Sequence, residues 1–124
     1  MNNFILIFIG GGLGSVTRYG LGAYIAKQVN SIFPWGTLTI NIAASFILGL
    51  LAGFIFQRSG NYETQRLLIG IGFCGGFSTF STFSLELFEM IRNGNAMMAI
   101  LYIVASVFAT LIAFWAAHLL LRVA

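Results

Sequence analysis

The side chains best suited to chemistry lie in one short block, Gly75-Gly76-Phe77-Ser78-Thr79-Phe80-Ser81-Thr82-Phe83. A glycine pair is followed by hydroxyl side chains interleaved with phenylalanines. Hydroxyls donate hydrogen bonds, and the edge of an aromatic ring is positive although the ring carries no net charge. Such a set can hold a small anion with uncharged groups. We therefore expect this block to line a passage for something small and polar.

The phenylalanines also have a simpler interpretation. Phe77, Phe80 and Phe83 recur at every third residue, and in a membrane helix such a stripe usually faces lipid or packs in a core. The hydroxyls and the glycine pair favour the polar passage, because lipid cannot satisfy loose backbone or unpaired hydroxyls. Polar, glycine-broken sequence at membrane depth is expected where it lines a cavity or is buried in protein. We expect the helix to break near Gly75-Gly76.

Other polar residues lie within the apolar segments on either side of this block. Asn41 follows Thr37 in the second apolar segment. Its side chain either makes a structural hydrogen bond to another helix or points its amide into the pathway. Ser106 and Thr110 are four residues apart, hence on one helix face, although both could bond back to their own helix. The type of residue alone does not separate these alternatives.

Arg18 is the one charged residue deep inside the first apolar segment, and such residues are functional candidates by default. It could draw anions into a vestibule, pair with Glu86 of a second copy of the chain, or extend outward to the membrane surface. We favour an electrostatic or structural role over direct contact with a ligand. Glu86 and Glu89 are interpreted as the water-exposed end of the third segment.

The elements that position these residues are predicted to be membrane helices. The chain has 124 residues, of which 59% are hydrophobic and 7% are charged, and its mean hydropathy is +0.95. Because a soluble domain carries roughly 25% charged residues, we predict an all-α membrane protein. Four apolar runs are each long enough to cross a bilayer, and they cover residues 4–26, 35–56, 67–91 and 96–121. We expect one four-helix transmembrane domain over residues 1–124, with the first run a retained helix and not a signal peptide.

The basic residues do not fix an orientation. Arg58, Arg66 and Arg122 lie on one side of the four spans, against Lys27 and Arg92 on the other, where Arg18 adds a third. A small sample explains this balance as well as insertion in both directions, which would give an antiparallel dimer. A chain of four short helices also offers little interior, so a pore would form more naturally between two subunits.

Several function classes are excluded or disfavoured. Single Cys74 and His118 residues offer no metal-ligand spacing. No nucleophile–base pair and no carboxylate pair appears, so an enzyme is not expected, and the scattered bases disfavour nucleic acid. Gly70-Ile71-Gly72-Phe73-Cys74-Gly75 matches the dinucleotide fingerprint in letters, but it lies within an apolar span with no strand before it.

With these residues in view, the sequence resembles the small fluoride channel family, also called the camphor-resistance family. The resemblance covers nearly the whole chain, and the block at residues 75–83 is its most specific part. Two weaker parts are Gly11-Gly12-Leu13-Gly14 with Arg18-Tyr19, and Trp35-Gly36-Thr37-Leu38 with Asn41. Departures are small: the family often has Thr where this chain has Ser78, and Gly where it has Ala44 or Ser45.

The resemblance implies a bacterial inner-membrane protein that forms an antiparallel, dual-topology homodimer and exports fluoride passively through two pores. It implies a fluoride pathway in which Asn41, Phe80 and Phe83 line the pore and Ser81 and Thr82 flank it. Thr37 of the second span, and Tyr102 and Thr110 of the fourth, also belong to this pathway. It also implies a structural Na⁺ at the dimer centre, held by backbone carbonyls of Gly75 and Ser78 from both subunits. Carbonyls released by a broken helix suit such a cation.

Two rival functions stand beside this one. A small multidrug antiporter also has four short helices inserted both ways, but it needs a buried carboxylate, and the first span offers Arg18 with no Asp or Glu. In a purely structural membrane subunit, the block at residues 75–83 would serve only as an assembly interface.

Overall fold

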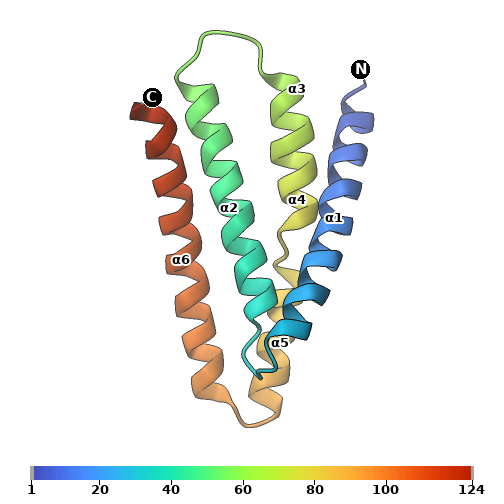
Figure 1. Ribbon diagram of the computed structural model, residues 1–124, viewed down its shortest axis with the longest axis vertical. Helices are drawn as coiled ribbons and strands as arrows, with labels where there is room; N and C mark the ends of the chain where they lie inside the picture. Colours follow the sequence, from blue (N-terminus) through green and yellow to red (C-terminus); the bar gives the residue numbers. More distant parts are fainter. Residues whose placement is uncertain (1, 124) are drawn as a thin grey trace.

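The computed structural model describes residues 2–123, which form helices and no strand (Figure 1). The order of elements is α1 (Asn3–Gln28), α2 (Trp35–Phe56), α3 (Glu63–Gln65), η1 (Arg66–Cys74), α4 (Gly75–Phe77), α5 (Ser81–Arg92) and α6 (Ala96–Val123). Within the described residues, four helical stretches are long and apolar enough to cross a membrane, the third being Glu63–Arg92. The prediction of an all-α, four-span membrane protein is confirmed.

Local sequence explains where the helices start and stop. The Asn2 side chain accepts a hydrogen bond from the Phe4 amide at 2.8 Å and so caps the start of α1. Pro34 stands directly before α2, where a helix start tolerates proline. Gly94, with φ of 83°, takes the left-handed conformation that turns the chain from α5 into α6. The predicted spans therefore match the observed ones within a few residues at each end.

The third span is not one regular helix. After α3, the nine residues of η1 form a π-helix, in which each amide bonds one residue further back than in an α-helix. α4 follows, and Ser78 then becomes extended with φ of −78° and ψ of 158°. The chain becomes helical again at α5, which begins at Ser81. The predicted break is confirmed, three residues after Gly75, whereas the π-helix was not predicted.

Glycines allow the helices to pack with their backbones in contact. A Cβ atom on Gly10 would lie 2.9 Å from the Phe73 amide nitrogen, and one on Gly14 would lie 2.8 Å from that of Phe77. α1 therefore rests directly on η1 and α4. On the other side of the bundle, a Cβ on Gly53 would lie 2.8 Å from the His118 carbonyl oxygen, so α2 rests on α6. Gly10, Gly14 and Gly53 thus serve contacts within one chain.

The bundle exposes most of its surface. In the most apolar 18 residues of each span, only between 17% and 28% are buried. Both described ends of the chain lie at the same end of the bundle as the connection between α2 and α3 (Figure 1). A small buried cluster of Leu38, Phe83, Met90, Ala99 and Tyr102 joins α2, α5 and α6 at the opposite half. So much apolar surface requires lipid or another protein chain to cover it.

Candidate functional site

The break in the third span is held by a side chain from the second. The Asn41 amide nitrogen donates to the Thr79 carbonyl oxygen at 3.2 Å, and the Thr79 amide donates back to the Asn41 side-chain oxygen at 2.9 Å. In an unbroken α-helix the Thr79 amide would bond to Gly75 instead. Asn41 therefore replaces helical hydrogen bonds that the break removes.

Hydroxyl groups complete both ends of the break. Ser78 Oγ donates to the Cys74 carbonyl at 2.7 Å, on the last turn before it. On the other side, the Thr82 amide donates to Thr79 Oγ1 at 3.1 Å, so Thr79 caps the start of α5. Thr79 Oγ1 also lies 3.3 Å from Ser81 Oγ. Sequence reasoning did not single out Thr79 as a site residue, although a threonine just before a restarting helix is a capping signal.

Arg18 contacts the same break from the first span. Its Nε atom donates to the Gly76 carbonyl oxygen at 3.0 Å. In a continuous helix, that carbonyl would accept from the Phe80 amide. Arg18 therefore bonds to a backbone group that the broken helix releases. The broken segment is thus fixed by one polar side chain from α1 and another from α2.

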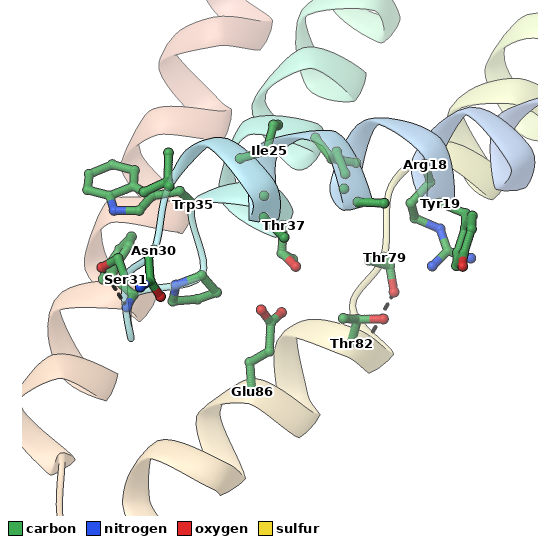
Figure 2. Close-up of a pocket in the computed structure, with 18 residues that line it drawn as sticks. Arg18, Tyr19, Ile25, Asn30, Ser31, Trp35, Thr37, Thr79, Thr82 and Glu86 are labelled. Carbon is green, nitrogen blue, oxygen red and sulfur yellow. Dashed lines mark hydrogen bonds between the residues drawn. The ribbon is translucent and has the colours of Figure 1, made fainter.

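A cavity of about 470 Å³ opens beside the break, between α1, α2 and α5 (Figure 2). Its polar wall includes Arg18, Thr37, Thr79, Thr82 and Glu86. Glu86 and Thr37 point toward one another in Figure 2, while Arg18 lies above Thr79. Tyr102 donates a long hydrogen bond to Glu86 Oε1 at 3.4 Å. The cavity therefore carries one cation and one carboxylate. Glu86, interpreted from sequence as a helix-end charge or as a partner of Arg18 in another copy, belongs to its wall.

A second cavity of about 270 Å³ lies on the other side of the break. Polar groups and phenylalanine rings from three spans line it: Asn41, Ser45, Ser78, Thr79, Phe80, Phe83, Ser106, Val107 and Thr110. None of these side chains is charged. Thr79 lines both cavities, so the Asn41–Thr79 pair forms part of the partition between them.

The residues predicted to line the fluoride pathway are thus divided between the larger and the smaller cavity. Asn41, Phe80, Phe83 and Thr110 meet in the smaller cavity, whereas Thr37 and Thr82 line the larger one. Two more do not line either of these cavities: Ser81 is exposed, and Tyr102 is fully buried.

The two pathway phenylalanines have different surroundings. Phe83 is 9% exposed, and its ring centroid lies 4.9 Å from that of Tyr102. Phe80 is 78% exposed, and its only ring neighbour among the described residues is Phe83 at 5.5 Å. Phe83 is therefore fixed by packing within the chain, while Phe80 faces outward from it.

On α6, Thr110 Oγ1 donates to the Ser106 carbonyl at 2.6 Å, which is the local back-bond considered from sequence. Ser106 Oγ is buried beside the smaller cavity and has no hydrogen-bond partner among the described residues. A buried hydroxyl without a partner is costly. Ser106 is therefore a donor available to a polar guest in that cavity, and it makes no bond back to its own helix, the alternative considered from sequence.

The backbone carbonyl oxygens of Gly75 and Ser78 are ligands of the kind that a hard cation such as Na⁺ accepts. Ser78 is extended, and the Thr79 amide that would bond to Gly75 is taken by Asn41, so both carbonyls leave the helical ladder. Gly75 and Ser78 line a third cavity of about 170 Å³. A Cβ on Gly75 would meet nothing within 4 Å, so this face of the chain is open. Neutral carbonyl oxygens freed by unwound helices are ligands that Na⁺ accepts.

The chain is similar to known proteins over most of its length. The sequence profile of the family described as CrcB-like protein, Camphor Resistance (CrcB), matches residues 5–118. The chain is 40% identical to the "Fluoride-specific ion channel FluC" of Rhizobium meliloti (strain 1021), over 98% of each chain. It is 50% identical to the protein of that name from Pyrococcus furiosus, over 86% of this chain and 85% of the relative. It is 38% identical to a third, from Sphingopyxis alaskensis, over 98% of this chain and 97% of the relative.

Proposed function

Because the chain belongs to the CrcB-like, camphor-resistance family, we propose that it is a passive, highly selective fluoride channel that exports the ion from the cytoplasm. Membership confirms the resemblance drawn from the third span, and it confirms that the chain is not an enzyme. The relatives are named as fluoride-specific channels, and the smaller cavity of this chain has the chemistry that fluoride requires.

One observation carries the proposal: the wall of the smaller cavity offers hydrogen-bond donors and phenylalanine rings but no charge. Fluoride is a small anion that gives up its hydration shell reluctantly. A conducting site must replace that shell, yet hold the ion weakly enough to release it. The free N–H of the Asn41 amide, the unpartnered hydroxyl of Ser106, and the rings of Phe80 and Phe83 meet both conditions. A cation in the same place would trap the ion.

The path we propose runs from the larger cavity to the smaller one. Fluoride enters beside Arg18 and passes the hydroxyls of Thr37 and Thr82, which line the larger cavity. It then crosses the partition at Asn41, whose amide keeps a second N–H free while the first bonds to Thr79. From there it passes Phe80 and Phe83, with Ser81, Tyr102 and Thr110 flanking the path.

We propose that two copies pair antiparallel to complete the pathway. In a single chain the Phe80 ring is 78% exposed, so one side of the smaller cavity has no wall. A second copy would supply that wall, and two copies related by symmetry would contain two pores. The near-equal count of basic residues at the two ends supports insertion in both orientations.

The same pairing gives the freed carbonyls a role. Gly75 and Ser78 from both copies would hold a structural Na⁺ at the dimer centre, on the open face of α4. When bound, the ion would be coordinated by carbonyl oxygens that lack hydrogen-bond donors, and so would tie the two broken helices together. Neutral ligands would suit a monovalent ion that has no part in the transport step.

The proposed location is the inner membrane of a bacterial cell, where such a channel has a clear use. Neutral hydrogen fluoride crosses membranes and ionises inside the cell. The trapped anion needs an exit, and the membrane potential, negative inside, drives it outward. A passive pore is sufficient for this task, and no coupled proton is required.

Efflux from liposomes tests the proposal. Purified protein is reconstituted in liposomes loaded with equal fluoride and chloride, without a proton gradient, and release is followed with ion-selective electrodes. We expect rapid fluoride release and little chloride release, against protein-free liposomes as the control. Equal release of both ions would contradict a selective channel. Release only under an opposing proton gradient would favour an antiporter, and no release at all would favour a structural subunit.

A further inference from the structure

We infer that Arg18 is a positioning residue of the pathway, which acts through its hydrogen bond to Gly76 and not through its charge. This role presupposes the channel function proposed above. Arg18 Nε donates to the Gly76 carbonyl oxygen at 3.0 Å, so its partner is a backbone carbonyl and not a carboxylate. The hydrogen bond joins α1 to the last turn of helix before the break.

The sequence of α1 brings Arg18 to that carbonyl. Gly10, Gly14 and Arg18 are spaced four residues apart, and so they lie along one face of the helix. The two glycines hold this face on η1 and α4, because a Cβ on Gly14 would lie 2.8 Å from the Phe77 amide nitrogen. Gly76 is also pressed on α1, where a Cβ would clash with the Gly11 carbonyl. The next position along the face reaches the break itself.

The Gly76 carbonyl needs a donor because the helix ends there. The last carbonyls of a helix have no intrahelical partner. Arg18 Nε donates to this one, at a depth where the carbonyl would otherwise lack a donor. Gly76 lies three residues before Thr79, whose backbone is held from the other side by Asn41. Arg18 and Asn41 therefore fix the two sides of one short segment.

This segment determines where the pathway residues stand. Ser78, Thr79 and Phe80 form the break, and all three line the smaller cavity. If the Gly76 carbonyl loses its partner, the break can move, and with it the donors and the Phe80 ring edge. Arg18 is also one of the residues that line the larger cavity. Arg18 could therefore attract the anion by its charge or hold the backbone by its hydrogen bond, and substitutions can separate these two roles.

Two substitutions separate them. Arg18→Gln places an amide nitrogen at the same distance along the side chain as Arg Nε, and so keeps a donor while removing the charge. Arg18→Met has similar length but neither donor nor charge. We expect the Gln variant to release fluoride about tenfold faster than the Met variant, the size of effect that a lost hydrogen bond to a buried group produces. Arg18→Lys keeps the charge and serves as the electrostatic control.

Backbone hydrogen exchange in the purified protein supplies a second readout that does not depend on transport. Exchange at residues 78–82 should accelerate in the Met variant and stay near the wild-type rate in the Gln variant, while α6 is unchanged in both. Equal loss of flux in Gln and Met, with full rescue by Lys and no change in exchange, would overturn the positioning role in favour of an electrostatic one. Failure of the wild-type protein to conduct fluoride would instead refute the proposed function, and the exchange data would still decide the role of Arg18 in fixing the break.

Discussion

Asn41 and Thr79 exchange two hydrogen bonds across the break in the third span, at 3.2 Å and 2.9 Å. The pair lies where two cavities meet, since Thr79 lines both of them. A side chain that looked like a pathway ligand in the sequence is thus also a structural clamp. Its loss should affect folding as well as transport.

Asn41→Ala should therefore lower the free energy of unfolding by about 1–3 kcal/mol, because the Thr79 amide and carbonyl would each lose a partner. Thermal denaturation in detergent measures the change. Asn3→Ala is the matched control, since the exposed Asn3 side chain makes one long bond of 3.4 Å to Glu63. We expect the control to shift by less than about 0.5 kcal/mol. Equal shifts would mean that the clamp has no special role.

The two pathway phenylalanines should respond differently to substitution by isoleucine. Both Phe80→Ile and Phe83→Ile should slow fluoride efflux at least about tenfold, because the ring edge that favours the anion is lost. Only Phe83→Ile should also destabilise the fold, by about 1–2 kcal/mol, since it breaks the 4.9 Å contact with Tyr102. Efflux and denaturation are measured on the same preparations. Phe88→Ile, an exposed ring on the same helix, is the control for flux. Unchanged flux in both pathway variants would show that the rings only pack.

Gly14→Ala should destabilise the protein by about 1–3 kcal/mol, because its Cβ would press on the backbone of the third span. Gly20→Ala is the control on the same helix: its Cβ would meet nothing within 4 Å, so the change should be neutral or stabilise by up to about 1 kcal/mol. Thermal denaturation compares the two. If Gly14→Ala were as stable as Gly20→Ala, α1 would not rest on η1 as described.

Insertion in both orientations can be measured by thiol labelling of intact cells. Native Cys74 is buried, so it should give little background. Asn61→Cys places a thiol in the connection between α2 and α3, which lies outside the spans. A membrane-impermeant maleimide should label about half of this variant from outside, because half of the chains would present that connection there. Labelling of all or none would contradict dual topology.

Sodium removal tests the proposed ion site. Exchange of Na⁺ for N-methylglucamine during purification should weaken the dimer on size-exclusion chromatography and reduce fluoride efflux, because the freed carbonyls of Gly75 and Ser78 would lose their cation. A Na⁺ arm at equal ionic strength is the control. Indifference to the exchange would argue against a bound ion at these residues.

Composition and apolar run length were sufficient to predict the fold. The predicted second span at residues 35–56 coincides with α2, and the fourth starts at Ala96 as α6 does. The glycine pair signalled the break, because polar sequence at membrane depth has to line a cavity or lie inside protein. The π-helix from Arg66 to Cys74 could not be predicted. Nothing in the residue types indicates whether a backbone amide bonds to the carbonyl four residues back, as in an α-helix, or five residues back, as in a π-helix.

The partners of the site residues were harder to predict than the residues themselves. Arg18 and Asn41 were both selected as costly polar groups inside apolar spans, but each bonds to backbone 58 or 38 residues away in sequence. Backbone atoms carry no sequence signal. The rule that could have found these bonds is that every released amide and carbonyl at a break needs a partner. The place of Glu86 in the wall of the larger cavity was not predicted, because a charge near a helix end is normally solvated.

The π-helical stretch has a consequence for how this gene can vary in length. A π-helix uses more residues per turn than an α-helix, so residues 66–74 contain more chain than their span requires. Deletion of one residue there could be absorbed by a return to α-helical hydrogen bonds, with the downstream side chains kept on their faces. The same deletion in the regular α2 would rotate everything beyond it by about 100°. Among homologous genes, single-codon gaps should therefore gather in the first half of the third span.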